Sequence, residues 1–195
     1  MNEKGMTILE MMIVITILAV VVGAAITFLI FSNRQYSWID TNARIQKELR
    51  GALQEMTIDI KEARMVCDGS VANKLILSLP NMDTNGAIID YDTIVYEPSP
   101  TDTSNLRMTL TQGTGSSRHG WGKKIQSGNP SYWLLTVGLV NSGLIDSPSL
   151  FAYNDTTTTE ISEVTVTLKS RRHASLGKYQ EGMLSTNIRL RNKRE

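Results

Sequence analysis

A charge-free apolar run near the N-terminus constrains this chain more than any other feature. No Asp, Glu, Lys or Arg occurs between Glu10 and Arg34, and Met11–Phe31 is rich in Ile, Val, Leu and Met without a proline. About 21 residues at ~1.5 Å per residue make a helix of about 30 Å, which is the thickness of the hydrocarbon core of a bilayer. The run therefore predicts a helix that can span a membrane.

Two ordinary interpretations of this run stay open. One is a plain single-pass anchor. The other is a secretory signal cut at the small residues Val22-Gly23-Ala24, which would leave Ala25 as the first residue. Glu10 disfavours the secretory signal, because it puts a carboxylate where such signals carry positive charge. It also needs an explanation in any membrane helix, because a carboxylate in apolar surroundings costs free energy unless it is paired.

The order Gly5-Met6-Thr7-Ile8-Leu9-Glu10, followed at once by the apolar run, resembles the N-terminal signal of type IV pilins and of the pseudopilins of type II secretion. The resemblance covers about the first thirty residues. It implies that prepilin peptidase cuts after Gly5, that the new terminal amine on Met6 is N-methylated, and that the apolar segment is retained. It further implies that Glu10 faces that amine, in its own or a neighbouring subunit, and sets the register of assembly. Met6 departs from the Phe that is usual after the cut.

Helical periodicity continues beyond the apolar run. Apolar residues recur at three- and four-residue steps, and charged residues such as Asp59 and Glu62 fall largely off that stripe. No proline interrupts Met6–Met65, so we predict one helix of roughly 60 residues that stops before the pair Asp68-Gly69. The positions of the stripe are Ile45, Leu49, Ala52, Leu53, Met56, Ile60 and Ala63.

Past the helix, short β-favouring runs alternate with turn residues, which predicts an antiparallel sheet packed on the second half of the helix, an α+β fold. The glycine-rich stretch Gly113–Gly122 is predicted to be a loop, and Tyr132–Leu144 suits a short helix as well as a strand. The chain thus divides into a leader (1–5), a transmembrane or filament-core helix (6–33), an amphipathic second half of that helix (34–66) and a β-rich head (67–195). The predicted strands are Lys74–Leu79, Ala87–Glu97, Leu106–Thr111, Val164–Ser170 and Met183–Leu190.

Looser similarities narrow the resemblance. The helical stretch from Leu49 to Ala63 resembles the helix of PilW-type minor pilins and of pseudopilin-J-type proteins. The segments Phe151–Asp155, Val164–Leu168 and Leu184–Asn192 resemble the closing strands of the same group. Cys67 is the only cysteine, so no intrachain disulfide can form. Many major pilins have such a bond near the C-terminus, and its absence favours a minor subunit.

The sequence contains no recognisable catalytic set, so we expect a structural protein without a cofactor and not an enzyme. His119 and His173 lie far apart and lack the spacing of a zinc site, and Gly113–Gly122 lacks the pattern of a phosphate-binding loop. Weak calcium candidates exist, but their spacing does not fit an EF-hand, and Asn85-Gly86 is explained as a turn, so no metal site is predicted. These candidates are Asp83, Asn85, Asp90 and Asp92.

The charge balance does not predict nucleic-acid binding. Twenty Lys and Arg face nineteen Asp and Glu, a formal net charge of +1. The turn Arg171-Arg172-His173 and the basic tail suit the protection of a sheet edge against aggregation as well as they suit DNA. The residues of that tail are Arg189, Arg191, Lys193 and Arg194.

The resemblance therefore implies a minor pilin that helps to initiate or tip a type IV pilus. The predicted location is the bacterial inner membrane, crossed once with the head outside the cytoplasm, and then the pilus or pseudopilus. Expected partners are prepilin peptidase, other pilins or pseudopilins and the inner-membrane assembly platform. Two alternatives stay open: a minor pseudopilin of type II secretion, and a membrane-anchored extracytoplasmic binding domain that keeps its N-terminus and tolerates the loss of Glu10.

Overall fold

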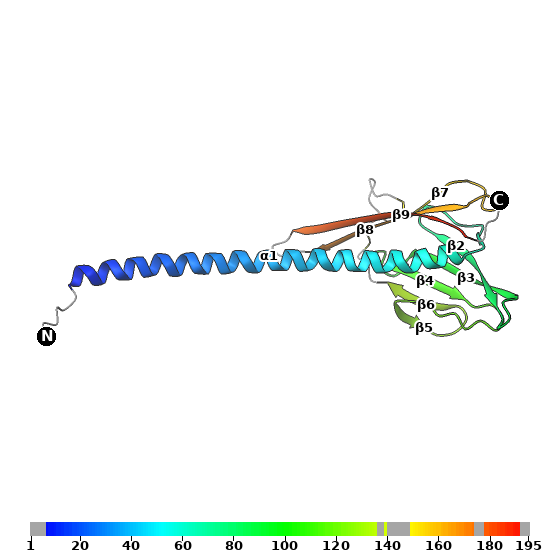
Figure 1. Ribbon diagram of the computed structural model, residues 1–195, viewed down its shortest axis with the longest axis horizontal. Coiled ribbons are helices and arrows are strands. Elements are labelled where there is room, and N and C mark those ends of the chain that lie inside the picture. The colour runs from blue at the N-terminus through cyan, green and yellow to red at the C-terminus, as the bar shows by residue number, and fades with distance from the viewer. Residues whose placement is uncertain (1–6, 136–138, 140–148, 174–177, 192–195) are drawn as a thin grey trace.

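The computed structural model describes residues 7–135, 139, 149–173 and 178–191 of the chain. Within these residues it has one long helix, α1 (Ile8–Glu62), and a set of antiparallel strands gathered around the C-terminal part of that helix (Figure 1). The predicted α+β layout, a long N-terminal helix with a C-terminal antiparallel head, is confirmed.

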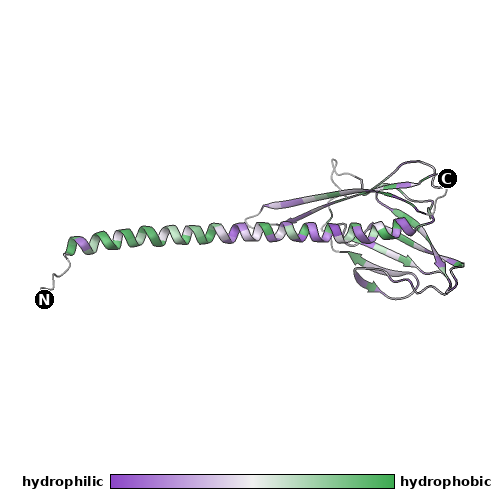
Figure 2. Ribbon diagram, in the orientation of Figure 1, coloured by the Kyte–Doolittle hydropathy of each residue, from purple (hydrophilic) through white to green (hydrophobic). Residues whose placement is uncertain are grey.

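α1 has two parts that differ in their surroundings. All residues from Thr7 to Phe31 are exposed, and between Phe31 and Thr41 only Ser32 is partly buried. Figure 2 shows the same division in hydropathy: the free end of the helix is almost uniformly apolar, whereas the part beside the head alternates between polar and apolar residues. All seven positions of the predicted apolar stripe are buried. The stripe also contains Asp59, which was predicted to lie largely outside it but is only 9% exposed.

The helix ends earlier than predicted. Ala63 is extended, with a ψ of 138°, and the next backbone amide, that of Arg64, donates to Ser78 O at 2.8 Å. Residues 65 and 66 therefore belong to a strand, and the predicted helix boundary at residue 66, with its stop at Asp68-Gly69, was wrong. The cause is visible in the sequence, because Val66 continues the three-residue apolar spacing of Ile60 and Ala63 while pairing with Leu77 in the sheet.

The first sheet has six strands in the order β1-β2-β3-β4-β6-β5, and each neighbouring pair is antiparallel. Alternate residues of its central strands face inward, as in Leu75, Leu77 and Leu79, so one face of the sheet is buried against the helix. The strands are β1 (Met65–Val66), β2 (Leu75–Met82), β3 (Ile88–Pro98), β4 (Leu106–Thr111), β5 (Lys123–Gln126) and β6 (Ser131–Leu135).

The second sheet has three antiparallel strands, β7 (Phe151–Tyr153), β8 (Glu163–His173) and β9 (Tyr179–Arg189). The long β8–β9 hairpin runs alongside α1 toward the free end of the helix (Figure 1). Gly182 makes this contact close, because a Cβ there would lie 2.6 Å from Ile45 Cγ2. Two sheets, one on each side of the helix, thus replace the single sheet that the sequence predicted, and they share one hydrophobic core with α1.

The five strands predicted from β-favouring runs are present as β2, β3, β4, β8 and β9, several of them longer than expected. β7 lies where the resemblance to minor pilins placed a closing strand. The ambiguous segment Tyr132–Leu144 begins as strand β6, and most of its remainder lies outside the described residues. β5 was not predicted because all four of its residues are exposed and show no alternation. The predicted loop Gly113–Gly122 connects β4 to β5.

Candidate functional site

The first candidate site is the start of α1, where Glu10 and Thr7 hold each other. The Thr7 hydroxyl accepts from the backbone amide of Glu10 at 3.3 Å, and the Thr7 backbone amide and hydroxyl donate to Glu10 Oε2 at 2.8 and 3.0 Å. This reciprocal arrangement is a capping box, and it satisfies backbone donors that a helix start leaves unpaired. Gly5 and Met6, the predicted cleavage and methylation residues, lie outside the described residues.

No role was predicted for Thr7, although the capping pattern is present in the sequence. Thr7-Ile8-Leu9-Glu10 fits the pattern of Ser or Thr followed three residues later by Glu, directly ahead of an apolar run. Glu10 thus has a local structural task as well as any task in assembly. A test of its charge must therefore leave the cap in place.

The second candidate site is the apolar surface that follows Glu10. Large side chains from Ile8 to Phe31 are about 50–80% exposed, and α1 contains a window of mean hydropathy 3.0, none of it buried. By length and composition α1 can cross a membrane. Its few polar side chains are satisfied within the helix, since Thr16 Oγ1 donates to Met12 O and Thr27 Oγ1 donates to Gly23 O. The segment therefore suits lipid or the core of a helical bundle equally well.

The weak calcium candidates belong to two separate places. Asp83 and Asn85 form the turn between β2 and β3, where Asp83 Oδ1 accepts from the amides of Asn85 and Ala87 at 2.8 Å each. These backbone bonds, that to Ala87 first, lower the pKa of Asp83. Asp90 and Asp92 lie on β3 and bind a different segment. Among the described residues there is no group of three or more His, Cys, Asp or Glu side chains that could hold a metal ion.

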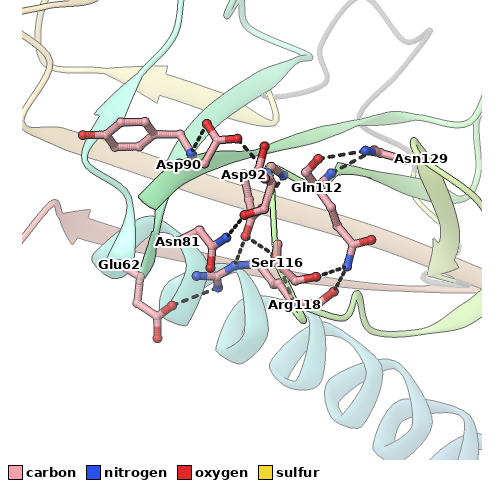
Figure 3. A network of polar contacts seen from close by, with 11 residues as sticks. Glu62, Asn81, Asp90, Asp92, Gln112, Ser116, Arg118 and Asn129 are labelled. Atoms are coloured by element: carbon pink, nitrogen blue, oxygen red, sulfur yellow. Dashed lines mark hydrogen bonds and ion pairs between the residues drawn. The ribbon is translucent and has the colours of Figure 1, made fainter. Parts of the chain in front are cut away.

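Asp90 and Asp92 fasten the loop after β4 to the sheet (Figure 3). Asp90 Oδ2 accepts from the amide of Thr114 at 2.6 Å, and Asp92 Oδ1 accepts from the amide of Gly113 at 2.8 Å. Gly113 permits this approach, since a Cβ there would lie 2.8 Å from Tyr91 O. The predicted loop is therefore pinned through its backbone, and the carboxylates that suggested a cation bind peptide N–H groups.

Arg118 joins the same loop to the end of α1. Its Nε donates to Asp92 Oδ2 and its Nη1 to Glu62 Oε2, both at 3.0 Å (Figure 3). Burial alone would lower the pKa of Arg118, but the hydrogen bonds to Glu62 and Asp92 raise it above its ordinary value. Asp92 is 1% exposed, so Arg118 compensates a carboxylate that water does not reach.

A second polar contact lies deeper between α1 and the six-stranded sheet. The Tyr96 hydroxyl donates to Asp59 Oδ2 and accepts from Trp121 Nε1 at 3.0 Å. Burial raises the pKa of Asp59 to about 6, against the opposing effects of the Tyr96 hydrogen bond and the charge of Arg118. Burial, together with the adjacent Asp59, raises the pKa of Tyr96 well above its ordinary value. These groups connect the helix, β3 and the loop, and they are far from the exposed apolar segment.

The remaining chemical candidates lie apart from one another. His119 is exposed in the loop after β4, and His173 is exposed at the end of β8, where its ring meets Tyr179 edge-on at 5.3 Å. Cys67 is a free, partly buried thiol, and burial raises its pKa, which disfavours the reactive thiolate. The described part of the chain brings neither histidine to the cysteine.

Comparison with known proteins adds one result, and it concerns the N-terminus. Residues 1–26 match the family model described as the prokaryotic N-terminal methylation motif. No curated protein and no solved structure matches the chain significantly. The matched range contains Gly5, Met6 and Glu10 and ends within the bare apolar part of α1. The chain therefore carries a prepilin-type signal of the type IV pilin and pseudopilin kind, which implies processing by prepilin peptidase, assembly with pilins and a structural role.

Proposed function

We propose that this chain is a minor pilin that helps to initiate or tip a type IV pilus. One observation carries the proposal: the methylation motif at residues 1–26 overlaps the part of α1 that the other described residues of the chain leave uncovered. The described residues of the head enclose the helix only from about Thr41 onward. Some 30 Å of apolar helix therefore projects from a folded head, which is the shape of a subunit that assembles through its N-terminal segment.

Before assembly, α1 anchors the chain in the bacterial inner membrane, with the head outside the cytoplasm. Prepilin peptidase removes residues 1–5, and Met6 becomes the N-methylated terminus. Other pilins and the inner-membrane assembly platform then take up the processed subunit. The exposed apolar surface and the motif support this sequence of events.

Glu10 supplies direction in this scheme. Both bonds from Thr7 end at Oε2, and we assign Oε1 to the amine of Met6 in the same or the neighbouring subunit. Lipid and a bundle of apolar helices are similar solvents for α1, so burial of apolar area discriminates weakly between them. A charge pair in a medium of low dielectric constant discriminates strongly, because a wrong register leaves both charges unpaired in surroundings that do not solvate them.

The closest alternative is a minor pseudopilin of type II secretion, which would use the same apolar segment and the same Glu10. The alternative from another class is an anchored extracytoplasmic binding domain, in which α1 stays in the membrane. The first experiment separates that class: the mass of the N-terminal peptide from the native membrane. We expect a peptide that begins at N-methylated Met6. A peptide with intact Met1 would contradict the proposal, and so would one that begins at Ala25.

The second experiment separates the charge of Glu10 from its part in the helix cap. Glu10→Gln keeps a side chain that can complete the capping box, whereas Thr7→Ala removes the cap and keeps the carboxylate. We expect E10Q to be processed normally but depleted at least tenfold from sheared filaments, and T7A to enter them at close to the normal level. Normal entry of E10Q into filaments, together with depletion of T7A, would assign Glu10 to helix capping and would contradict its assembly role. Loss of surface pili, or of protein secretion, in a deletion strain then chooses between the two machines.

A further inference from the structure

The end of the β8–β9 hairpin carries a concentration of positive charge that the proposed assembly function does not use. Between residues 34 and 48 of α1 and in hairpin residues 169–173 and 178–181, seven Lys or Arg stand against three Asp or Glu, a formal net charge of +4. The whole chain has a net charge of only +1, so the remainder is acidic. This local excess of positive charge lies on the side of the head from which the apolar helix projects (Figure 1).

The local ion pairs leave this excess in place. Arg172 Nη2 binds Glu48 Oε2 at 2.6 Å and fastens the hairpin to α1. Lys169 and Arg171 share one carboxylate, that of Glu181, at 3.1 and 3.6 Å. Arg171 also lies over the ring of Tyr179, 4.0 Å from its centroid, and Tyr179 is 58% exposed. The hairpin therefore ends in a basic and aromatic surface that is held against the helix and faces outward.

Two contacts fix the height of this surface along α1. Gly182 packs at Ile45, and the amide of Arg191 donates to Lys61 O at 3.2 Å. β9 thus runs in the same direction as α1, advancing about 30 Å of strand for about 24 Å of helix. At the same ratio of strand length to helix length, the three residues from Gly182 back to Tyr179 correspond to about five residues of helix. Tyr179 therefore lies at about the level of Asp40.

That level lies close to a bilayer surface if Met11–Phe31 occupies the hydrocarbon core. Asp40 is about 14 Å beyond Phe31 along the helix. The headgroup layer takes up about 5–8 Å of this distance, and charges at physiological salt interact over a further ~8–10 Å. Tyr36 and Trp38, exposed on the intervening turn, are the residue types that favour this interface.

We propose that the hairpin end, through Arg171, Lys178 and Tyr179, docks on the anionic phospholipid headgroups of the membrane that holds α1. The contact would hold the head at a fixed height and orientation until the subunit is withdrawn into a filament. The inference rests on the proposed function only for its membrane-anchored stage. Charge complementarity, with the continuity of this surface with the membrane helix, identifies the occupant.

The test uses the full chain in nanodiscs of phosphatidylcholine with or without about one third phosphatidylglycerol. A donor dye is placed at position 183 of a Cys67→Ser/Met183→Cys chain, since Met183 is 58% exposed on β9, and an acceptor dye is placed on a lipid headgroup. We expect about twofold higher energy transfer in the anionic discs, with the excess lost at about 0.5 M NaCl. Arg171→Gln/Lys178→Gln should lose the excess as well. Lys123→Gln/Lys124→Gln, an equal charge change on the exposed strand β5, should keep it.

Equal transfer in the two lipids, or an equal loss in the β5 control, would overturn the inference. If R171Q/K178Q fails to fold, the test is the effect of salt on energy transfer from the chain with the unmodified hairpin. Excess transfer that persists at about 0.5 M NaCl would then overturn the inference. Extraction at alkaline pH separates this result from the proposed function, because a chain that washes out of the disc lacks a membrane helix and both proposals fall. Duplex DNA added to the full chain provides the last outcome. DNA binding that R171Q/K178Q abolishes, with transfer to lipid unchanged, would assign the surface to nucleic acid and overturn the inference.

Discussion

The two parts of α1 belong to one uninterrupted helix but differ in which of their side chains are buried. From Ile8 to Phe31 every side chain is exposed and nearly every one is apolar, whereas from Ile45 to Ile60 a single stripe is buried between two sheets. The second part is complete within the chain, because the head supplies its apolar partners. The first part is incomplete, since an apolar surface of this size needs lipid or other helices. The second part of α1 therefore stabilises the head, whereas the first part is available to lipid or to the helices of other subunits.

The largest difference between the two parts is expected when a leucine side chain is shortened in each of them. Leu49 is fully buried, and a Cβ at Gly182 of β9 would lie 3.6 Å from its Cδ1, so we expect Leu49→Ala to lower the free energy of unfolding of the head by about 2–5 kcal/mol. Leu18 is 59% exposed, and Leu18→Ala should leave that free energy unchanged. Urea unfolding of the full chain in detergent, followed by tryptophan fluorescence, measures both. A comparable loss in L18A would show that the two parts are not independent.

The next largest effect concerns the charge buried in the second part. The pKa of Asp59 is about 6 in the folded protein against 3.8 ordinarily, so the folded state binds this proton more tightly than the unfolded state. The contribution of Asp59 to stability therefore falls as the pH rises from about 4 to about 6 and is most unfavourable above that range. Asp59→Asn keeps an acceptor for Tyr96 and removes the charge. We expect it to raise the free energy of unfolding at pH 7.5 by up to about 3 kcal/mol, and to change it little at pH 4.

Denaturant titrations of both proteins at the two pH values measure the difference. A loss of stability in D59N at pH 7.5 would mean that the interactions of the carboxylate with Tyr96 and Arg118 stabilise the fold by more than the burial of the charge destabilises it. A pH-independent difference would place the folded pKa of Asp59 near its ordinary value.

A smaller effect is expected where the hairpin meets the helix. At Gly182 an added Cβ would lie 2.6 Å from Ile45 Cγ2. This methyl group belongs to a β-branched side chain in a helix, whose χ1 angle is restricted, so it cannot rotate away freely. Gly182→Ala should therefore push β9 from α1 and lower the free energy of unfolding by about 1–3 kcal/mol. Hydrogen exchange at the amides of β8 and β9 should rise with it. Unchanged exchange and stability would mean that the hairpin is not fastened to the helix at this point.

The smallest effect runs the other way. A Cβ at Gly51 or Gly23 would meet no atom within 4 Å outside the local helix backbone, so each position is a glycine in an open helical site. Gly51→Ala should raise the free energy of unfolding of the head by about 0.5–1 kcal/mol, because alanine is the better helix former. Gly23→Ala should leave it unchanged. A gain from G23A equal to that from G51A would show that the free end of α1 unfolds together with the head.

The sequence was a good guide wherever one physical signal dominated. The apolar spacing from Ile45 to Ile60 predicted the buried stripe correctly, since a helix with one covered face needs that spacing. The same spacing misplaced the end of the helix, because Val66 satisfies both a helical and a strand pattern, and only the pairing with Leu77 decides between them. β5 gave no signal, since exposed residues on an edge strand show no alternation.

The polar residues were harder to interpret than the apolar ones. Asp90 and Asp92 were noted as oxygen donors, but their partners are backbone amides more than twenty residues away in the chain, which no local pattern reveals. The sequence pattern predicted Asp59 to lie largely off the buried stripe, because its partner, Tyr96, lies on another element. Thr7 could have been found, since the capping box is a local pattern. What is local in sequence could be predicted, and what depends on a distant partner could not.

Because α1 is one continuous helix, it fixes the rotation of the head about the helix axis relative to the apolar segment. An α-helix turns by about 100° and rises ~1.5 Å for each residue, so the number of residues between the apolar segment and the head sets the azimuth of the head as well as its height. One residue inserted between Arg34 and Asp40 would swing the head by nearly a third of a turn while lifting it by less than the width of an atom. In an assembly that holds the apolar segment in place, the number of residues between that segment and the head determines which surface of the head faces its neighbours. The contacting side chains are therefore not the only determinant of that surface.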